Sequence, residues 1–216
     1  MTVDAPALAC RPLVAGLIAV IAAMAASCAR TVAVEGSSPA PLVHTLPLSI
    51  GIFYDTGFRE ASHRVERPRQ RTFVVKFGAA NVEQFDNVFR SLFERAVPLE
   101  QMPAEGSSIP NVDAIIEPRI EEYAALTPDD SGQQFYAASI KYRIHLFSPD
   151  GTLIASWPVN AYGKSQWRAF RDKRVLREAS MLAIRDAAAS LALGFADQQQ
   201  VRTWLRSKGV RRAQGN

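Results

Sequence analysis

The chain has few of the residues from which catalytic and metal sites are usually built. Its 216 residues include only two cysteines, Cys10 and Cys28, and three histidines, His44, His63 and His145. The histidines lack the i, i+4 spacing of a helical metal pair, and no cysteine follows Cys28 to join them. We therefore predict no metal centre, no cofactor and no catalytic histidine.

Motifs of common enzyme classes are also absent. No serine lies in a Gly-x-Ser-x-Gly elbow. Gly163-Lys164-Ser165 is similar to the end of a phosphate-binding loop, but Pro158 stands where that motif needs its first glycine. Glu121 and Glu122 are neighbours on an expected strand, so they point to opposite faces and make a poor acid and base couple. A hydrolase-like enzyme therefore remains only a minor alternative.

The chain also lacks a strong charge of one sign. It carries 25 lysines and arginines against 21 acidic residues, a net charge of +4. Such a mild excess does not indicate a nucleic-acid partner, which typically requires a clustered basic footprint.

One apolar run is present, but it is too short to cross a membrane. Leu13–Ser27 offers roughly 14 apolar residues, whereas a spanning helix needs about 20. The length suits the apolar region of a secretion signal, and the run ends in small residues, as such signals do. Ordinary cleavage of a secreted protein and an uncleaved anchor remain alternatives.

The end of this run, Ala25-Ala26-Ser27-Cys28, resembles the lipobox of bacterial lipoproteins, although Ala25 stands where leucine is usual. The resemblance implies that residues 1–27 are removed as a signal peptide and that Cys28 carries the lipid. Cys10 would leave with the signal, so the mature protein could form no internal disulfide. By the same resemblance, Ala29 implies sorting to the outer membrane, on its periplasmic side.

Composition divides the remaining chain into three parts. Residues 28–47 hold the lipidated cysteine and a segment rich in proline and glycine, which we interpret as a flexible tether with a reach of roughly 25 Å. The alternative is a partly docked arm, because apolar residues that could pack occur there: Val32, Val34, Leu42, Val43 and Leu46. Residues 48–207 form a single domain, and residues 208–216 form a basic tail.

Periodicity predicts an α+β fold for the domain. Alternating or β-branched segments predict strands over residues 48–54, 72–77, 99–102 and 113–123, and a hairpin over residues 135–163 that turns at Ser148–Gly151. Apolar stripes predict a helix that Asn81 caps and Pro98 ends, a second helix over Val175–Phe195 and a short one capped by Asp197. Residues 55–71 are expected to be a loop. We expect a mostly antiparallel sheet of about four to six strands with two main helices on one face.

Two basic clusters are candidate binding surfaces for anionic lipid, lipopolysaccharide phosphates or an acidic protein partner. The first cluster comprises Arg59, Arg64, Arg67, Arg69 and Arg71. The second contains an aromatic residue among its cations and comprises Lys164, Trp167, Arg168, Arg171 and Arg174. The alternative, which the sequence favours, is that both clusters are solvated loops and helix surface.

The whole layout resembles small Gram-negative envelope lipoproteins. The resemblance rests on the lipobox and on the order of Ser49–Tyr54, Asp113–Tyr123, Tyr136–Trp157 and Ala179–Phe195. That group includes the lipopolysaccharide-assembly lipoprotein, auxiliary lipoproteins of ABC-type transport systems and activators of penicillin-binding proteins. It implies a non-catalytic binding, assembly or transport-accessory module with an envelope protein partner. The alternative is a lipid or small-molecule carrier with an apolar pocket between sheet and helices.

Overall fold

The computed structural model describes residues 30–36, 42–66, 72–167 and 171–210. Its elements in chain order are β1 (Arg30–Ala33), β2 (Leu46–Phe53), α2 (Thr56–Arg59), β3 (Ser62–Val65), β4 (Phe73–Lys76), α3 (Gly78–Leu92), β5 (Phe93–Leu99), β6 (Ala114–Leu126), α4 (Pro128–Ser131), β7 (Phe135–Phe147), β8 (Leu153–Gln166), α5 (Asp172–Gly194), the 3-10 turn η1 (Phe195–Asp197) and α6 (Gln199–Ser207). They form two sheets, a five-stranded sheet in the order β5-β2-β6-β7-β8 and a three-stranded sheet in the order β1-β4-β3. The predicted α+β class is confirmed.

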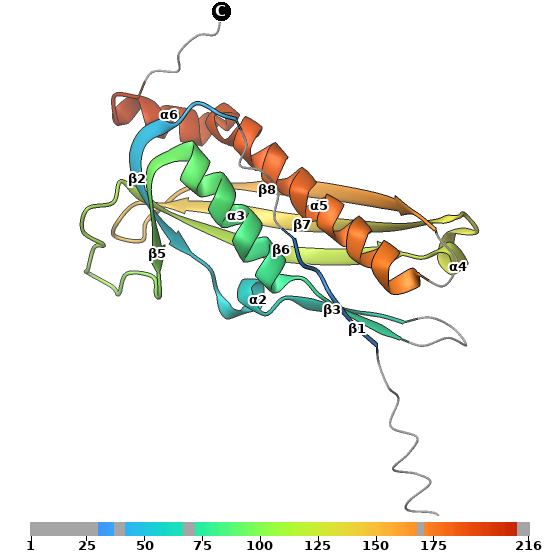
Figure 1. Ribbon diagram of the computed structural model, residues 1–216. Helices are drawn as coiled ribbons and strands as arrows, with labels where there is room; N and C mark the ends of the chain where they lie inside the picture. Colours follow the sequence, from blue (N-terminus) through green and yellow to red (C-terminus); the bar gives the residue numbers. More distant parts are fainter. Residues whose placement is uncertain (1–29, 37–41, 67–71, 168–170, 211–216) are drawn as a thin grey trace, which may run out of the picture.

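The long antiparallel strands β6, β7 and β8 are the framework of the larger sheet. From Ala138 onward the side chains of β7 alternate in burial, and one face of the strand is fully buried: Tyr136, Ala138, Ile140, Tyr142, Ile144 and Leu146. Gly151 closes the β7–β8 turn with a φ of 86° and donates its N–H to the Ser148 carbonyl at 2.9 Å. The buried residues face α3 and α5, which both lie over this side of the sheet in Figure 1.

Strand β2 makes the larger sheet mixed, because it runs parallel to both of its neighbours, β5 and β6. Its pairing with β6 covers only Ala114–Ile116. Pro118 therefore lies in an interior strand, but beyond the last residue paired with β2. There the missing N–H of proline costs no bond to β2. The register of β6 then shifts between Ile120 and Glu122, so an irregularity follows close after the proline.

Helix α3 differs from the prediction at both ends. It begins after Phe77, and the predicted cap Asn81 lies inside it, fully buried, where its Oδ1 accepts a hydrogen bond from the Tyr142 hydroxyl at 2.7 Å. The helix ends at Leu92 rather than at Pro98, because Phe93–Leu99 pairs with β2 as β5. Phe93 and Ala96 fit the helical stripe by spacing, but strand pairing overrides that local preference.

Helix α5 packs across β7 and β8, and at one point it approaches the sheet very closely. A Cβ atom on Gly163 would lie 2.1 Å from the Ala179 carbonyl oxygen, so only glycine fits there. The segment Asp172–Asp197 is long and apolar enough to cross a membrane by composition, yet 56% of its apolar window is buried within the fold. It is therefore a core helix. The short helix that follows, α6, is preceded by Gln198 and not by Asp197 as its N-cap.

The N-terminal segment shows the largest departure from the sequence prediction. Arg30–Ala33 forms β1, which pairs in parallel with β4, and Val32 and Val34 are each only 2% exposed. A flexible tether over this part is thus wrong, and the docked arm is the arrangement present. The expected loop over residues 55–71 is also interrupted, by α2 and β3.

The other predicted boundaries have different outcomes. The signal peptide, Cys28 and residues 211–216 lie outside the described residues. Of the predicted basic tail, Lys208 forms an ion pair with Asp113 at 3.2 Å, and the Val210 N–H donates to the Leu205 carbonyl at 3.0 Å. These first tail residues therefore belong to the folded domain.

Candidate functional site

The first basic cluster is described at two of its five positions. Arg59 ends α2, where its Nε donates to the Tyr54 carbonyl at 2.9 Å and its guanidinium lies 5.7 Å from the centroid of the Tyr54 ring. Arg64 is exposed on β3. Arg67, Arg69 and Arg71 lie outside the described residues. Arg59 therefore supports the local fold, whereas Arg64 presents its charge to solvent.

The second basic cluster lies at the end of β8 and the start of α5. The Lys164 ammonium lies 3.9 Å from the centroid of the Phe135 ring, and Arg174 pairs with Glu178 at 3.1 Å. Trp167 is 39% exposed, and Arg171 is exposed just before α5. Arg168 lies outside the described residues. Two of these cations thus have partners within the domain, which reduces the charge they offer to an anion.

The histidines lie apart from one another. His63 packs against the Tyr123 ring at 5.0 Å between centroids, and desolvation lowers its pKa. Desolvation also lowers the pKa of His145 on β7, against an opposing pull from Glu117. Within the described residues, no three His, Cys, Asp or Glu side chains gather in a way that could hold a metal ion.

One cross-strand row resembles a catalytic set in composition only. Glu117, His145 and Ser156 stand opposite one another on β6, β7 and β8. A serine, histidine and acid triad needs both imidazole nitrogens in hydrogen bonds. The Nδ1 atom of His145 is buried without a hydrogen-bond partner, so the row does not have that geometry.

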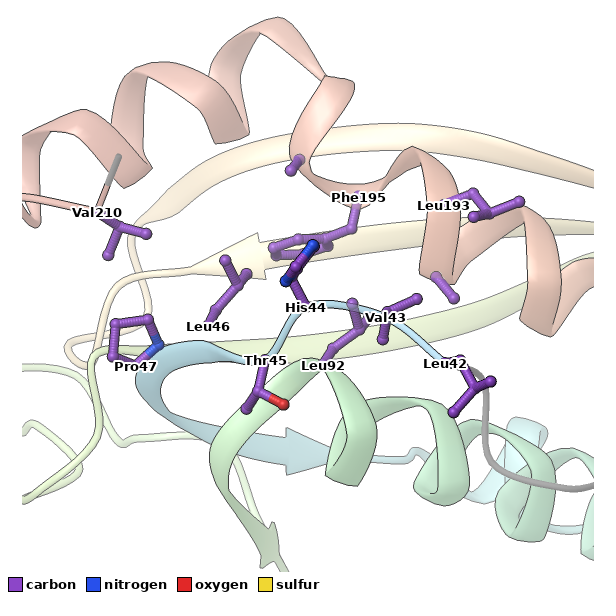
Figure 2. Close-up of a pocket in the computed structure, with 12 residues that line it drawn as sticks. Leu42, Val43, His44, Thr45, Leu46, Pro47, Leu92, Leu193, Phe195 and Val210 are labelled. Carbon is purple, nitrogen blue, oxygen red and sulfur yellow. The ribbon is translucent and has the colours of Figure 1, made fainter. Parts of the chain in front are cut away.

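An apolar pocket of about 620 Å³ lies where the chain enters β2. Its walls are the segment Leu42–Pro47, the end of α3 at Leu92, the C-terminal end of α5 with η1, and Val210. Figure 2 shows Phe195 between these walls, with His44 beside it and Leu42 and Leu193 towards one side. Leu42 is fully exposed and Leu193 is 71% exposed, so apolar side chains also stand at its rim. This volume is within the range of small-molecule sites.

The pocket has few polar groups, and they do not converge. His44 and Thr45 are the polar side chains of its lining, and the Thr45 hydroxyl already donates to the Ser91 carbonyl at 3.2 Å. The lining can therefore exclude water and hold an apolar group, but it offers no acid and base pair to a reaction. The sequence indicates an apolar pocket only in general terms, as one between sheet and helices. Its actual wall, Leu42–Pro47, was assigned to the tether, although Leu42, Val43 and Leu46 gave a signal there.

Comparisons with known proteins show the fold. Neither a protein-family model nor a curated protein matches the chain. A DUF330 protein from Xanthomonas campestris has a similar solved structure, with 15% identity and a TM-score of 0.52 over 80% of this chain and 99% of that one. This likeness shows a shared fold.

Two further solved structures are more distant. Uncharacterized lipoprotein B from Nitrosomonas europaea gives a TM-score of 0.44 and 13% identity, over 82% of this chain and 99% of that one. A minor lipoprotein from Acinetobacter baumannii gives a TM-score of 0.43 and 7% identity, over 72% of this chain and 96% of that one.

Proposed function

We propose that the chain is a lipid-anchored, non-catalytic protein of the cell envelope, held at the periplasmic side of the outer membrane through Cys28. The observation that carries the proposal is the sequence Ala25-Ala26-Ser27-Cys28 directly before a folded domain. The described part of that domain holds no metal-binding group and no complete catalytic set. We propose that it works by binding, as an assembly or transport-accessory module with an envelope protein partner.

The anchor is tested by labelling cells with radioactive palmitate. The wild-type protein is expected to take up label and to sediment with membranes, whereas Cys28→Ser is expected to do neither. Cys10→Ser is the matched control, because Cys10 precedes the proposed cleavage point and should leave labelling unchanged. Equal labelling of Cys28→Ser and the wild type would refute the anchor.

The pocket favours a second candidate function, the binding of an apolar ligand such as an acyl chain. Its volume of about 620 Å³ and its lining of leucine, valine, alanine and phenylalanine suit such a ligand better than a polar one. Burial of each methylene group of a bound acyl chain would contribute about 0.8 kcal/mol to the free energy of binding. This function is compatible with the anchor and would make the protein a carrier or a sensor of lipid.

Pocket binding is tested with a fluorescent fatty acid and the purified protein. Ala196→Phe places a ring in the lining and should abolish probe binding. Ala189→Phe adds the same bulk at an exposed position elsewhere on α5 and should leave binding intact. Unfolding midpoints of both variants show whether either has lost its fold. Undiminished binding in a folded Ala196→Phe protein would exclude this pocket as the site.

A further inference from the structure

We infer that the outer face of the three-stranded sheet lies against the anionic surface of the membrane that holds the anchor. This inference rests on the proposed lipidation of Cys28. The outer face consists of Thr31, Ala33, Ser62, Arg64, Val74 and Lys76, as the strand pairing defines it.

The first argument is the length of chain between lipid and fold. Strand β1 begins at Arg30, whose N–H donates to the Thr72 carbonyl at 3.0 Å. Arg30 is two residues after Cys28, and an extended chain spans at most about 3.6 Å per residue. The start of β1 is therefore within about 7 Å of the lipidated Cα atom, so the domain has no room to stand away from the bilayer.

The second argument is how the small sheet is held to the domain. On its inner face, Val32, Val65, Phe73 and Val75 are buried in the main core. His63 on the same face packs against Tyr123 of β6. The sheet thus moves with the domain as one body, and a membrane contact made by its outer face orients the whole protein.

The third argument is the charge of the outer face. Two rows of side chains cross it, Thr31–Val74–Arg64 and Ala33–Lys76–Ser62. Both contain one cation and no acid. Arg30 is a third exposed cation, at the start of β1 nearest the anchor, in the inner row with Phe73 and Val65. Two acids lie just outside the two rows: Glu35, two residues after β1, and Glu66, directly after β3. No ion pair within the described chain engages Arg30, Arg64 or Lys76.

These features fit a phospholipid surface better than a protein pocket. Four short polar or apolar side chains, Thr31, Ala33, Ser62 and Val74, share the face with the two cations Arg64 and Lys76. Anionic headgroups attract such cations, and the attraction fades within a Debye length, so it acts only where the anchor holds the face close. The part of the pocket lining formed by η1 and Val210 then lies far from this membrane, because β1 and α6 lie at opposite ends of the molecule in Figure 1.

Single-cysteine reporters on the anchored protein test the orientation. Once Cys28 is lipidated and Cys10 has left with the signal, a new cysteine is the sole free thiol. Ala33→Cys and Ser62→Cys place a fluorophore on the outer face, and Thr203→Cys places one on α6 as the matched control. Each labelled protein is reconstituted in vesicles of phosphatidylethanolamine and phosphatidylglycerol, and quenching by aqueous iodide is measured.

We expect the reporters at positions 33 and 62 to be shielded from iodide and the reporter at position 203 to be quenched. Palmitate labelling of the same samples separates the two hypotheses. Acylated protein with three equally quenched reporters would overturn the membrane-facing sheet and leave the anchor intact. Protein that carries no acyl group would overturn the anchor, and the inference with it.

A charge variant tests why the face lies there. Arg30→Gln, Arg64→Gln and Lys76→Gln together should restore iodide quenching at position 33, since each lost charge weakens the contact about fivefold. The control variant removes three exposed cations elsewhere, Arg95→Gln, Arg202→Gln and Arg206→Gln, and should stay shielded. Equal shielding of both variants, or of the wild type on phosphatidylcholine vesicles, would overturn the role of the three cations.

Discussion

Gly163 shows how a single residue sets the distance between helix and sheet. It lies on β8 beneath α5, and its missing side chain lets the Ala179 carbonyl and the Ala183 nitrogen approach its Cα atom closely. A methyl group there would meet backbone atoms, which cannot rotate away as a side chain can. The many alanines of α5 permit a close approach to the sheet, but the contact point itself depends on the packing of the whole helix.

Gly163→Ala is therefore expected to lower the free energy of unfolding by about 3 kcal/mol or more, because an extra methyl must force helix and sheet apart. Gly194→Ala is the matched control, since no atom lies within 4 Å of a Cβ added there. That change should be neutral or slightly stabilising. Urea denaturation of both variants provides the measurement, and equal midpoints would contradict the close contact.

His63 and His145 predict how stability depends on pH. Desolvation lowers both pKa values below the ordinary 6.5, so the folded protein takes up these protons later than the unfolded chain as pH falls. The free energy of unfolding should therefore decrease as pH falls from about 7 to about 5, and it should be fully restored above that window. In the double variant His63→Gln, His145→Gln, the decrease in the free energy of unfolding should be smaller, as urea denaturation across that pH window would show. An unchanged slope would indicate that other groups cause it.

At the scale of elements, β1 shows that a local sequence pattern predicts some elements of the fold and not others. The hairpin β7–β8 and the body of α5 were predictable, because long periodic patterns mark them. β1 has only four residues, its partner β4 begins 43 positions later in the register, and residues 36–47 after it are rich in glycine and proline. A short strand with a distant partner gains its stability from tertiary contacts, which no local window contains.

The position of the pocket could not be predicted from the sequence for the same reason. Its walls come from residues 42–47, 92, 192–196 and 210, and no local pattern joins those positions. In contrast, four neighbouring residues, Ala25-Ala26-Ser27-Cys28, predict the lipidated residue. Cys28 lies outside the described residues, so its lipidation stays a prediction.

Val32→Ala tests β1 as part of the core. Removal of two buried methyl groups should lower the free energy of unfolding by about 2 kcal/mol. Thr31→Ala on the exposed face of the same strand should change it by less than about 0.5 kcal/mol. Thermal and urea unfolding distinguish the two. A Val32→Ala protein as stable as the wild type would restore the tether interpretation.

At the scale of the whole molecule, the folded domain begins earlier than composition suggests. The expected boundary at residue 48 divides the chain inside β2 and removes β1 entirely. The three-stranded sheet would then keep only the β3–β4 hairpin, and a two-stranded hairpin is marginal by itself.

A shortened chain that starts at residue 28, with Cys28→Ser, should therefore unfold cooperatively. One that starts at residue 46, which keeps β2 complete but lacks β1, should be less stable and more rapidly cleaved by protease around residues 62–76. Limited proteolysis followed by mass spectrometry locates the cuts. Identical protection of residues 62–76 in both chains would show that β1 is dispensable.

The parallel pairing of β1 with β4 also has a mechanical consequence. If Cys28 carries the proposed lipid, a pull between the membrane and the domain enters the fold at Arg30 and runs along the axis of β1. The hydrogen bonds to β4, including those from the Arg30 and Val34 nitrogens to the Thr72 and Lys76 carbonyls, lie across that direction. Force would load them together in shear instead of opening them one after another. The strand would therefore stay paired when force is applied through the lipidated N-terminus. It would resist that force more strongly than four residues of β-structure suggest.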